Sequence, residues 1–478
     1  MKEMKAITTS AMFLALGAFF GLVSCTMAPE YTRPQAPVST NWPSGPAYQE
    51  RNNSLSDTKA VDLPWQEFFI DQQLQKLIAL ALGNNRDLRI AALNIERSQA
   101  QYRIQRADLL PAVNATAGGS GQRIPETLSN NGQAETTHQY NVGLGVSSYE
   151  LDLFGRIQSL KDQALAQYLA TGQTQRTVQI SLVAEVATTY LNLAADRERL
   201  KLAHDTLKTQ QATCQMMQRR FELGASSELD LQQAQTRVDA ARIDIAHYTT
   251  LVAQDENGIN LVVGSSVPAE LLPQSLSNTL TAMQDISPGL PSEVLLQRPD
   301  ILAAENLLQG FNANIGAARA AFFPRITLVG SLGLGSDELS GLFQSGSGAW
   351  AFSPKIELPI FDTGARSAQL KVAEVDRDIA VARYEKTIQN AFREVADALA
   401  QRGTIDEQVA AQQSLTDTTA RSLHLSQVRY EKGIDSYLSE LDAQRSLYSA
   451  QQGLINSRLT RLLNLVTLYK VMGGGTGR

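Results

Sequence analysis

The sequence predicts a mainly α-helical fold with a membrane β-barrel, in which hairpins of long helices and short β-strands occur twice. Three observations lead to this prediction. One unit recurs about 210 residues further along the chain. Two proline-free stretches are long enough for very long helices, and four short segments alternate apolar with polar residues. Two copies of one unit favour a symmetric wall or ring over a catalytic pocket.

The repeat is clearest at a five-residue motif. Arg-Phe-Glu-Leu-Gly at 220–224 returns as Arg-Tyr-Glu-Lys-Gly at 429–433, and a Ser-x-Leu follows each copy. Upstream, Leu-Leu-Pro at 109–111 matches Phe-Phe-Pro at 322–324. The chain is therefore predicted to be a tandem duplication. The expected organisation is a lipoprotein signal peptide at 1–24, a lipidated strap at 25–65, a first repeat at 66–290, a second repeat at 291–470, and equatorial or tail segments at 263–291 and 471–478.

The N-terminus is typical of an exported lipoprotein. Lys2 and Lys5 precede an apolar stretch at 11–20 that is too short to span a membrane stably. It ends at Cys25, where cleavage and lipidation are expected, so palmitate and other acyl chains would anchor the mature chain. The alternative is an ordinary secretory signal with a chance cysteine. Thr26 replaces the Asp that retains such proteins in the inner membrane, which favours the outer membrane.

Composition argues against several classes of function. A net charge of −6 argues against nucleic acid as a partner. Cys214 is the only other cysteine, so we expect no disulfide framework and no thiolate metal cluster. The four histidines lack metal-ligand spacing, and no catalytic arrangement stands out. We therefore expect no enzyme, no metal and no cofactor beyond the lipid on Cys25.

Two helices are predicted to be unusually long. The stretches from Gly155 to Gly224 and from Gly364 to Gly433 contain no proline. At about 1.5 Å per residue, each helix would extend roughly 100 Å. Every seventh residue from Val186 to Phe221 is apolar, which predicts a coiled-coil seam. Shorter helices are expected at 66–110, 227–262, 292–322 and 436–470.

Four segments read as membrane strands, at about 112–123, 138–153, 325–336 and 349–361. Alternation with period two and one apolar face is the signature of outer-membrane strands. The alternative is a small soluble sheet packed on a helix, but the helices offer no broad apolar face to cover one. No run of about 18 apolar residues follows the signal, so a membrane crossing would have to use strands.

Four membrane strands cannot close a barrel, because about eight is the practical minimum. Open strand edges are excluded in lipid, since their backbone groups would lack hydrogen-bond partners. The barrel must therefore be built from several chains. Two chains would give about eight strands and a filled lumen, and three would give about twelve and an open pore.

Several motifs together resemble one known family. They are the lipobox before Cys25, Pro-x-Tyr-x-Arg-Pro at 29–34, Phe-Gly-Arg at 154–156, Leu-Gln-Arg-Pro-Asp-Ile at 296–301 and Leu-Asp-Ala-Gln-Arg at 441–445. In these motifs the chain is similar to the outer membrane efflux lipoproteins, the TolC-like (NodT/OprM-type) ducts of resistance–nodulation–division pumps. The resemblance implies a homotrimer with a twelve-stranded β-barrel, a periplasmic α-barrel and an equatorial belt. It also implies docking to a periplasmic adaptor (membrane fusion protein) and, through it, to an inner-membrane pump.

The turns of the two hairpins are the candidate site. Gly224 and Gly433 are expected to end the long helices, and Ser227 and Ser436 to cap the returning ones. The resemblance assigns the periplasmic gate, an aperture closed by ion pairs and apolar plugs, to the second turn. The residues concerned there are Arg429, Tyr430, Leu438 and Asp442.

Arg429 can donate a forked, charge-assisted hydrogen bond to a carboxylate such as Asp442, while Leu438 would narrow the opening. Arg220 and Asp230 occupy comparable places in the first copy. The alternative interpretation is an ordinary solvated ion pair contributing less than about 1 kcal/mol.

The function expected is the outer membrane exit duct of a tripartite efflux pump, passing drugs or other toxic solutes outward and extending into the periplasm. Two alternatives remain. A type I secretion duct shares the fold, although lipidation and the strap favour the efflux branch. A structural coiled-coil lipoprotein would need no strands. Discrete conductance in planar bilayers would separate a duct from such a spacer.

We predict that Cys25→Ser leaves a trimer that still inserts in the outer membrane. Twelve strands would bury far more apolar surface than the acyl chains do. Fractionation of cells expressing the variant measures this. A variant found wholly soluble in the periplasm would show that the membrane-barrel prediction is wrong.

Overall fold

The computed structural model describes residues 26–48, 63–129, 132–276 and 295–474. The predicted signal peptide 1–24, Cys25 and most of the segment 263–291 lie outside the described residues. The chain divides into two compact units, each drawn from both predicted repeats. The first comprises Met1–Gln35, Asn94–Thr171 and Ala303–Tyr384, and the second Ala36–Leu93, Gly172–Leu302 and Glu385–Arg478. The division of the sequence into two repeats stays a prediction, since the compact units cut across it.

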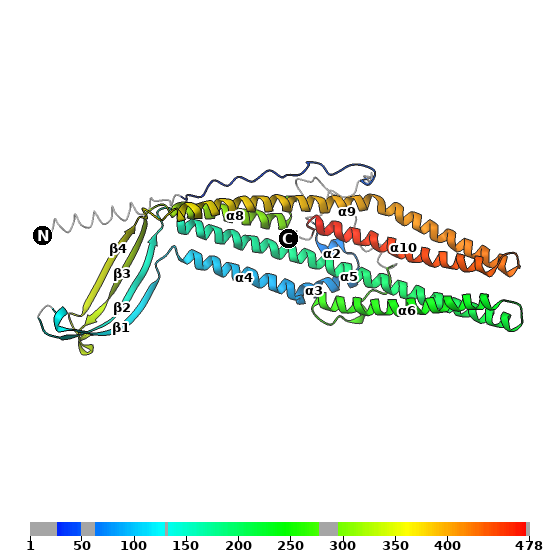
Figure 1. The fold of residues 1–478 in the computed structure, drawn as a ribbon, viewed down its shortest axis with the longest axis horizontal. Helices are drawn as coiled ribbons and strands as arrows, with labels where there is room; N and C mark the ends of the chain where they lie inside the picture. Colours follow the sequence, from blue (N-terminus) through cyan, green and yellow to red (C-terminus); the bar gives the residue numbers. More distant parts are fainter. Residues whose placement is uncertain (1–25, 49–62, 130–131, 277–294, 475–478) are drawn as a thin grey trace. The chain divides into compact units, whose positions relative to one another are not determined.

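Helices make up most of the described chain (Figure 1). The long helices are α5 (Arg156–Glu222) and α9 (Ala365–Glu431), which have 67 residues each, as the equal glycine spacing predicts. The shorter helices are α2 (Trp65–Phe68), α3 (Gln72–Asn84), α4 (Arg86–Ala107), α6 (Glu228–Val263), α8 (Pro299–Ala320) and α10 (Tyr437–Val471).

The continuous helix expected at 66–110 is wrong, because two polar residues interrupt it. Asp71 caps α3 by accepting from the backbone N–H groups of residues 73 and 74. Asn85 takes an extended backbone between α3 and α4, and its Oδ1 accepts from Leu88 N at 2.9 Å. Its Nδ2 donates to Val262 O at 2.7 Å. The break therefore ties the start of α4 to the end of α6.

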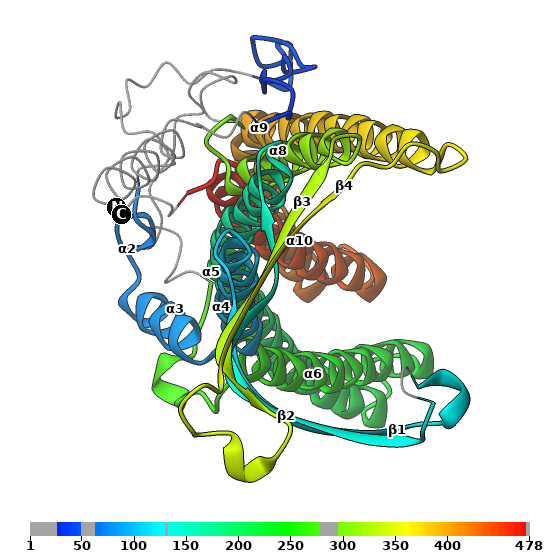
Figure 2. The same ribbon diagram turned by 90° about the vertical axis from the view of Figure 1, so that its left-hand side faces the viewer.

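The first unit contains one antiparallel sheet with the strand order β1-β2-β3-β4 (Figures 1 and 2). The strands are β1 (Val113–Ile124), β2 (Glu135–Leu151), β3 (Arg325–Ser336) and β4 (Gly348–Glu357). All four lie at the expected places. Strands β2 and β3 pair although α5 and α6 separate them in sequence, and a bulge shifts their register between Val146 and Tyr149.

Two glycines set how closely β2 and β3 approach. Gly143 and Gly333 are directly opposed in the register. A Cβ atom added to Gly333 would lie 2.3 Å from Val142 O and 2.7 Å from the Cα of Gly143. Gly335, two residues along the same strand, has its nearest such contact at 3.8 Å. The sheet therefore requires glycine at residue 333 but not at residue 335.

The N-terminal strap packs on α8 within the first unit. Arg33 forms a forked pair with Glu305, with Nε–Oε1 at 2.7 Å and Nη2–Oε2 at 2.8 Å, and Tyr31 donates to the same carboxylate at 3.1 Å. Further along α8, Asn312 donates to Pro29 O at 2.7 Å. The Pro-x-Tyr-x-Arg-Pro motif thus supplies the side chains that hold the strap.

The second unit has the larger apolar core, in which α2, α3, α5, α6 and α10 meet. Phe68 stacks on Tyr469 with ring centroids 4.3 Å apart, and Phe69 meets both rings edge-on. The Tyr469 hydroxyl donates to Leu63 O at 3.0 Å, so its one polar atom is satisfied inside the core. Tyr190 of α5 is also fully buried there.

The predicted heptad seam on α5 is only partly buried. Val186 and Leu193 are at most 2% exposed, but Phe221 at the end of the same row is 39% exposed. From the middle of α5 onward the buried row consists instead of Asp196, Ala203, Gln210 and Met217, also spaced by seven. A straight helix drifts against a seven-residue repeat, so the buried row changes along its length. Two of the residues on the new row are polar.

Both long helices end in the same way. Gly224 and Gly433 have φ of 68° and 70°, the left-handed conformation that glycine adopts without strain. In each turn the glycine N–H and the next N–H reach back to carbonyls of the last helical turn, forming the Schellman motif. The predicted C-terminal glycines are therefore confirmed.

The two returning helices begin differently. Ser227 caps α6: its Oγ accepts from Asp230 N at 3.1 Å, and Asp230 Oδ2 accepts from Ser227 N at 3.2 Å. This reciprocal pair is a capping box. Ser436 lies at the N-cap position of α10, but its side chain makes no capping hydrogen bond.

This difference gives a matched pair of variants. We expect Ser227→Ala to raise amide hydrogen exchange in the first turn of α6 by about fivefold, since a lost N-cap costs about 1 kcal/mol. Ser436→Ala should leave the first turn of α10 nearly unchanged. Equal effects of the two substitutions would contradict the assignment.

A second prediction concerns the sheet. Gly333→Val should destabilise the pairing of β2 with β3 by about 1–3 kcal/mol, because the added atoms collide with backbone that cannot move aside. The thermal midpoint of the β-sheet infrared signal in detergent measures this. Gly335→Val is the control. Equal midpoints for the two variants would argue against a required close approach.

Candidate functional site at the hairpin turns

Near the turns of the second unit, the two hairpins share a small apolar cluster. Met217 of α5, Ala234 of α6, and Tyr437 and Leu441 of α10 are at most 2% exposed. Because the two helices of the first hairpin and one helix of the second contribute, the turns are packed against each other within one chain. Two residues at the start of α10, Tyr437 and Leu441, were not expected from the sequence.

Arg220 and Tyr430 link the ends of the two long helices. Arg220 Nη1 donates to the Tyr430 hydroxyl at 2.6 Å, and the guanidinium lies 5.2 Å from the ring centroid. Burial raises the pKa of Tyr430, while the positive charge of Arg220 opposes this. Two of the predicted site residues are thus brought together, one from each copy of the repeat.

The expected partner of Arg429 is wrong within this chain. Its guanidinium forms a forked bond with Asp435 instead of Asp442, with Nε–Oδ2 at 2.6 Å and Nη2–Oδ1 at 2.9 Å. The glycine turn folds the chain back, which brings the residue before the α10 cap beside the last turn of α9. This pair raises the pKa of Arg429 and lowers that of Asp435. The sequence signal for this ion pair was an acidic residue, Asp435, between Gly433 and Ser436.

Asp442 and Leu438 lie on the exposed side of α10. Asp442 pairs with Arg445, one helical turn away, at 3.0 Å, and both side chains are more than half exposed. Leu438 is 54% exposed, and Leu229, its counterpart in the first copy, is 66% exposed. Both leucines therefore have room for a partner outside the chain.

Asp230 does not pair with Arg220 in this structure. Its carboxylate is part of the α6 capping box with Ser227, and it also accepts from the Ser227 hydroxyl at 2.7 Å. The two turns thus use their acids differently: Asp230 caps α6, whereas Asp435 pairs with Arg429.

A buried polar relay behind the turns was missed by the sequence analysis. Gln210 Nε2 of α5 donates to Gln444 Oε1 of α10 at 3.0 Å, and Gln444 Nε2 donates to Glu440 Oε1 at 3.0 Å. All three residues are less than 8% exposed. Desolvation raises the pKa of Glu440, which hydrogen bonds from Gln444 partly offset. The available signals were Gln210, which lies fourteen residues after Asp196 on α5, and the four-residue spacing of Glu440 and Gln444 on α10.

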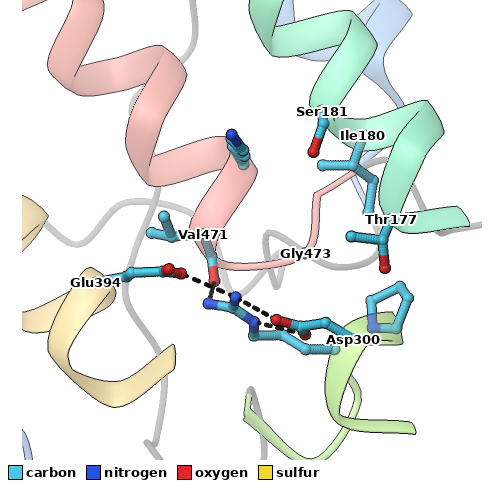
Figure 3. A pocket seen from close by; sticks show the side chains of 10 residues that line it. Thr177, Ile180, Ser181, Asp300, Glu394, Val471 and Gly473 are labelled. Carbon is cyan, nitrogen blue, oxygen red and sulfur yellow. Dashed lines mark hydrogen bonds and ion pairs between the residues drawn. The ribbon is translucent and has the colours of Figure 1, made fainter. Parts of the chain in front are cut away.

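A second polar node lies elsewhere in the second unit, beside the small pocket of Figure 3. Arg298 donates to Asp300, to Glu394 Oε2 at 2.9 Å and to Val471 O at 2.7 Å. The guanidinium, from the Leu-Gln-Arg-Pro-Asp-Ile motif, therefore joins the start of α8, α9 and the last turn of α10.

The sheet of the first unit has one apolar face and one polar face. Ala115, Leu144, Leu332 and Trp350 form a row across all four strands. Leu144 is 57%, Leu332 71% and Trp350 77% exposed. The opposite face carries small and polar residues, among them Asn114, Thr116, Asn141, Ser331 and Ser353.

Strands β1 and β4 each pair on one side only within the described chain. An exposed apolar face and two open edges are costly in water, and open edges are excluded in lipid. The sheet therefore requires further strands from outside the described part of the chain.

Among the described residues, no group of three or more His, Cys, Asp or Glu side chains is arranged to hold a metal ion. One helix among the described residues, α5, contains a stretch that is long and apolar enough to cross a membrane by length and composition. Most of that stretch is buried in the protein, as in the core helix of a soluble bundle.

Comparison with known proteins identifies close relatives. The chain is 48% identical over 469 residues to a probable efflux pump outer membrane protein, TtgC, of Pseudomonas putida, covering 98% of this chain and 96% of the relative. It is 45% identical over 470 residues to the outer membrane protein OprJ of Pseudomonas aeruginosa, with the same coverage.

Solved structures share the fold. A membrane protein from Pseudomonas aeruginosa superposes with a TM-score of 0.88 at 44% identity, covering 94% of this chain and all of that one. The open state of the MtrE outer membrane channel of Neisseria gonorrhoeae gives 0.84 at 40% identity, covering 94% and 98%. The prediction of a mainly α fold with four strands per chain is confirmed.

The family model for outer membrane efflux proteins matches residues 77–265 and 290–474, one stretch in each predicted repeat. With relatives this similar over nearly the whole chain, the predicted efflux function in the outer membrane is confirmed. The chain belongs to the outer membrane efflux protein family.

Proposed function

We propose that three copies of this chain form the exit duct of a tripartite efflux pump. Each copy contributes four strands to a twelve-stranded barrel, and the long helices form a tube in the periplasm. The duct receives its solutes from an inner-membrane pump through a periplasmic adaptor. A lipid on Cys25 anchors each copy to the outer membrane, and no step of the transport requires an enzyme or a cofactor.

The main support for this proposal is the four-stranded sheet of the first unit. Its apolar face suits lipid and its polar face suits a water-filled lumen. The two open edges can be satisfied only by the edges of neighbouring copies. Three copies are favoured over two because about eight strands leave no open lumen.

The names of relatives support the class of solute. Curated relatives include an antibiotic efflux pump outer membrane protein and a toluene efflux pump outer membrane protein, both of Pseudomonas putida. We propose that this chain likewise passes small organic toxicants, such as drugs and solvents. Its own structure contributes the passage, and the selection occurs in the partners upstream.

Planar-bilayer recording tests the proposal. The purified full-length protein should give discrete, uniform conductance steps, and native mass spectrometry of the same sample should give the mass of three chains. A homogeneous, inserted protein that never conducts would favour the structural lipoprotein. A conducting dimer would contradict the twelve-stranded barrel.

We further propose that the second turn is part of the gate. Arg429 and Asp435 brace that turn, Arg220 and Tyr430 hold the hairpins together, and exposed Leu438 and Asp442 face neighbouring copies. These contacts can be removed without disturbing the long helices, since the second unit keeps its own apolar core.

We predict that Arg429→Ala together with Asp435→Ala raises single-channel conductance with little change in trimer melting, because the turn loses its brace. Asp442→Ala combined with Arg429→Ala should also raise it. The wild type should approach the variants at high salt, where exposed pairs are screened.

A matched control is the pair Asp239 and Arg242 on α6, which is exposed and spaced as Asp442 and Arg445 are. Alanine at both positions should leave conductance unchanged. If the double variants at the second turn also conduct like the wild type at every salt concentration, the constriction lies elsewhere, at Leu438 or at the first turn near Asp230.

A further inference from the structure

A buried pair of acids lies between the two helices of the first hairpin, α5 and α6, in the second unit and well away from the turns. Asp196 of α5 is a charged residue on the buried seven-residue row, and it is only 7% exposed. Asp255 of α6 faces it, and the Oδ2 atom of Asp255 is buried without a hydrogen-bond donor among the described residues. Two carboxylates in contact need either a cation or a proton between them.

Among the described residues, one cation, Arg199, acts on this pair, and it already has other hydrogen-bond partners. Arg199 of α5 pairs with Asp196 and also donates to Asn456 Oδ1 of α10. Its charge therefore balances one of the two acids and ties the first hairpin to the second. The remaining acid has no basic partner in the contacts of the described residues, so a proton is the simplest way to satisfy Oδ2 of Asp255.

The surroundings keep this contact at the junction of three helices. Tyr248 of α6 accepts from Gln452 Nε2 of α10 at 3.1 Å, and Tyr448 of α10 donates to Asp244 Oδ2 at 2.7 Å. The charged and titratable groups that act on the pair are Arg199 on α5 and Tyr248 on α6. From α10 comes the neutral side chain of Asn456, which accepts from Arg199.

We propose that Asp196 and Asp255 share a proton and form an acid-tightened contact between α5 and α6, the two helices of the first hairpin. With the proton in place, the carboxyl of Asp255 donates to Asp196, and α6 stays packed on α5. Without it, two negative charges meet in a buried site with one arginine between them. The contact then loosens, and with it the link from Arg199 to α10.

The electrostatics give the pH range. Burial, and next the negative charge of Asp196, raise the pKa of the Asp255 carboxyl to about 6, while Arg199 opposes the shift. An exposed aspartate has a pKa of about 3.9. Because the packed state has the higher pKa, its stabilisation is greatest at low pH and is lost as the pH rises through about 6.

Hydrogen exchange on the purified full-length protein tests the proposal without requiring a channel. After correction for the intrinsic pH dependence, amides of α5, α6 and α10 around these residues should exchange roughly fourfold more slowly at pH 5.5 than at pH 7.5. Asp255→Asn supplies a permanent donor, so its exchange should be slow at both pH values. Wild-type pH dependence retained in Asp255→Asn would overturn the proposal.

Two more variants complete the test. Asp196→Asn leaves Arg199 facing Asp255 alone, which lowers the pKa of Asp255, so the pH dependence between 5.5 and 7.5 should vanish. Should Asp255→Asn fail to fold, this variant decides the question, and an unchanged pH dependence in it would contradict a shared proton. Glu256→Gln is the matched control: Glu256 adjoins Asp255 but pairs with Arg197, so the pH dependence should persist.

The consequence for transport rests on the proposed function. If the first hairpin tightens in acid and keeps its Arg199 link to α10, the wild-type conductance should be lower at pH 5.5 than at pH 7.5, and that of Asp255→Asn should not change. A silent bilayer together with the expected exchange pattern would argue against the duct and leave the acid pair intact. Normal conductance together with pH-independent exchange would support the duct and contradict the shared proton.

Discussion

The unpaired edges of the four-stranded sheet are the constraint on which the rest of this protein depends. A strand that ends a sheet leaves a row of backbone groups without partners, and lipid cannot hydrogen-bond them. Strands β1 and β4 each have such an edge within the described chain. The apolar row through Leu144, Leu332 and Trp350 makes the sheet equally unsuited to water. One chain therefore folds its helices into a core but leaves its sheet to be completed by others.

In the second unit the constraint is a different one, the alignment of the long helices. Apolar contacts along such helices recur with every turn and would tolerate sliding. Polar contacts do not, because each donor must meet its own acceptor. Arg199 with Asn456 and Gln210 with Gln444 join α5 to α10 at two levels. Together with the apolar packing of Met217 near Tyr437, they set a single register.

Much of this fold could be predicted from the sequence, and the failures share a cause. The long helices, the glycine turns and the four strands follow from local signals: proline-free length, glycine at 224 and 433, and period-two alternation. The partner of Arg429 could not be predicted, because a turn geometry decides whether Asp435 or Asp442 lies nearer. The buried row through Asp196 and Gln210 was missed because apolar residues were taken as the mark of a seam, whereas this row includes polar residues that bond to Arg199 and to Gln444.

The equal length of α5 and α9 has a consequence for how such a chain can change over time. Side chains at most positions can be exchanged with modest effects. An insertion within one long helix, in contrast, would displace its turn from that of the other and shift every cross-hairpin contact beyond it. A change of length is therefore tolerable only if both copies acquire it together, in whole repeats of the packing. The predicted duplication would thus let the two halves diverge in sequence only as long as α5 and α9 keep the same length.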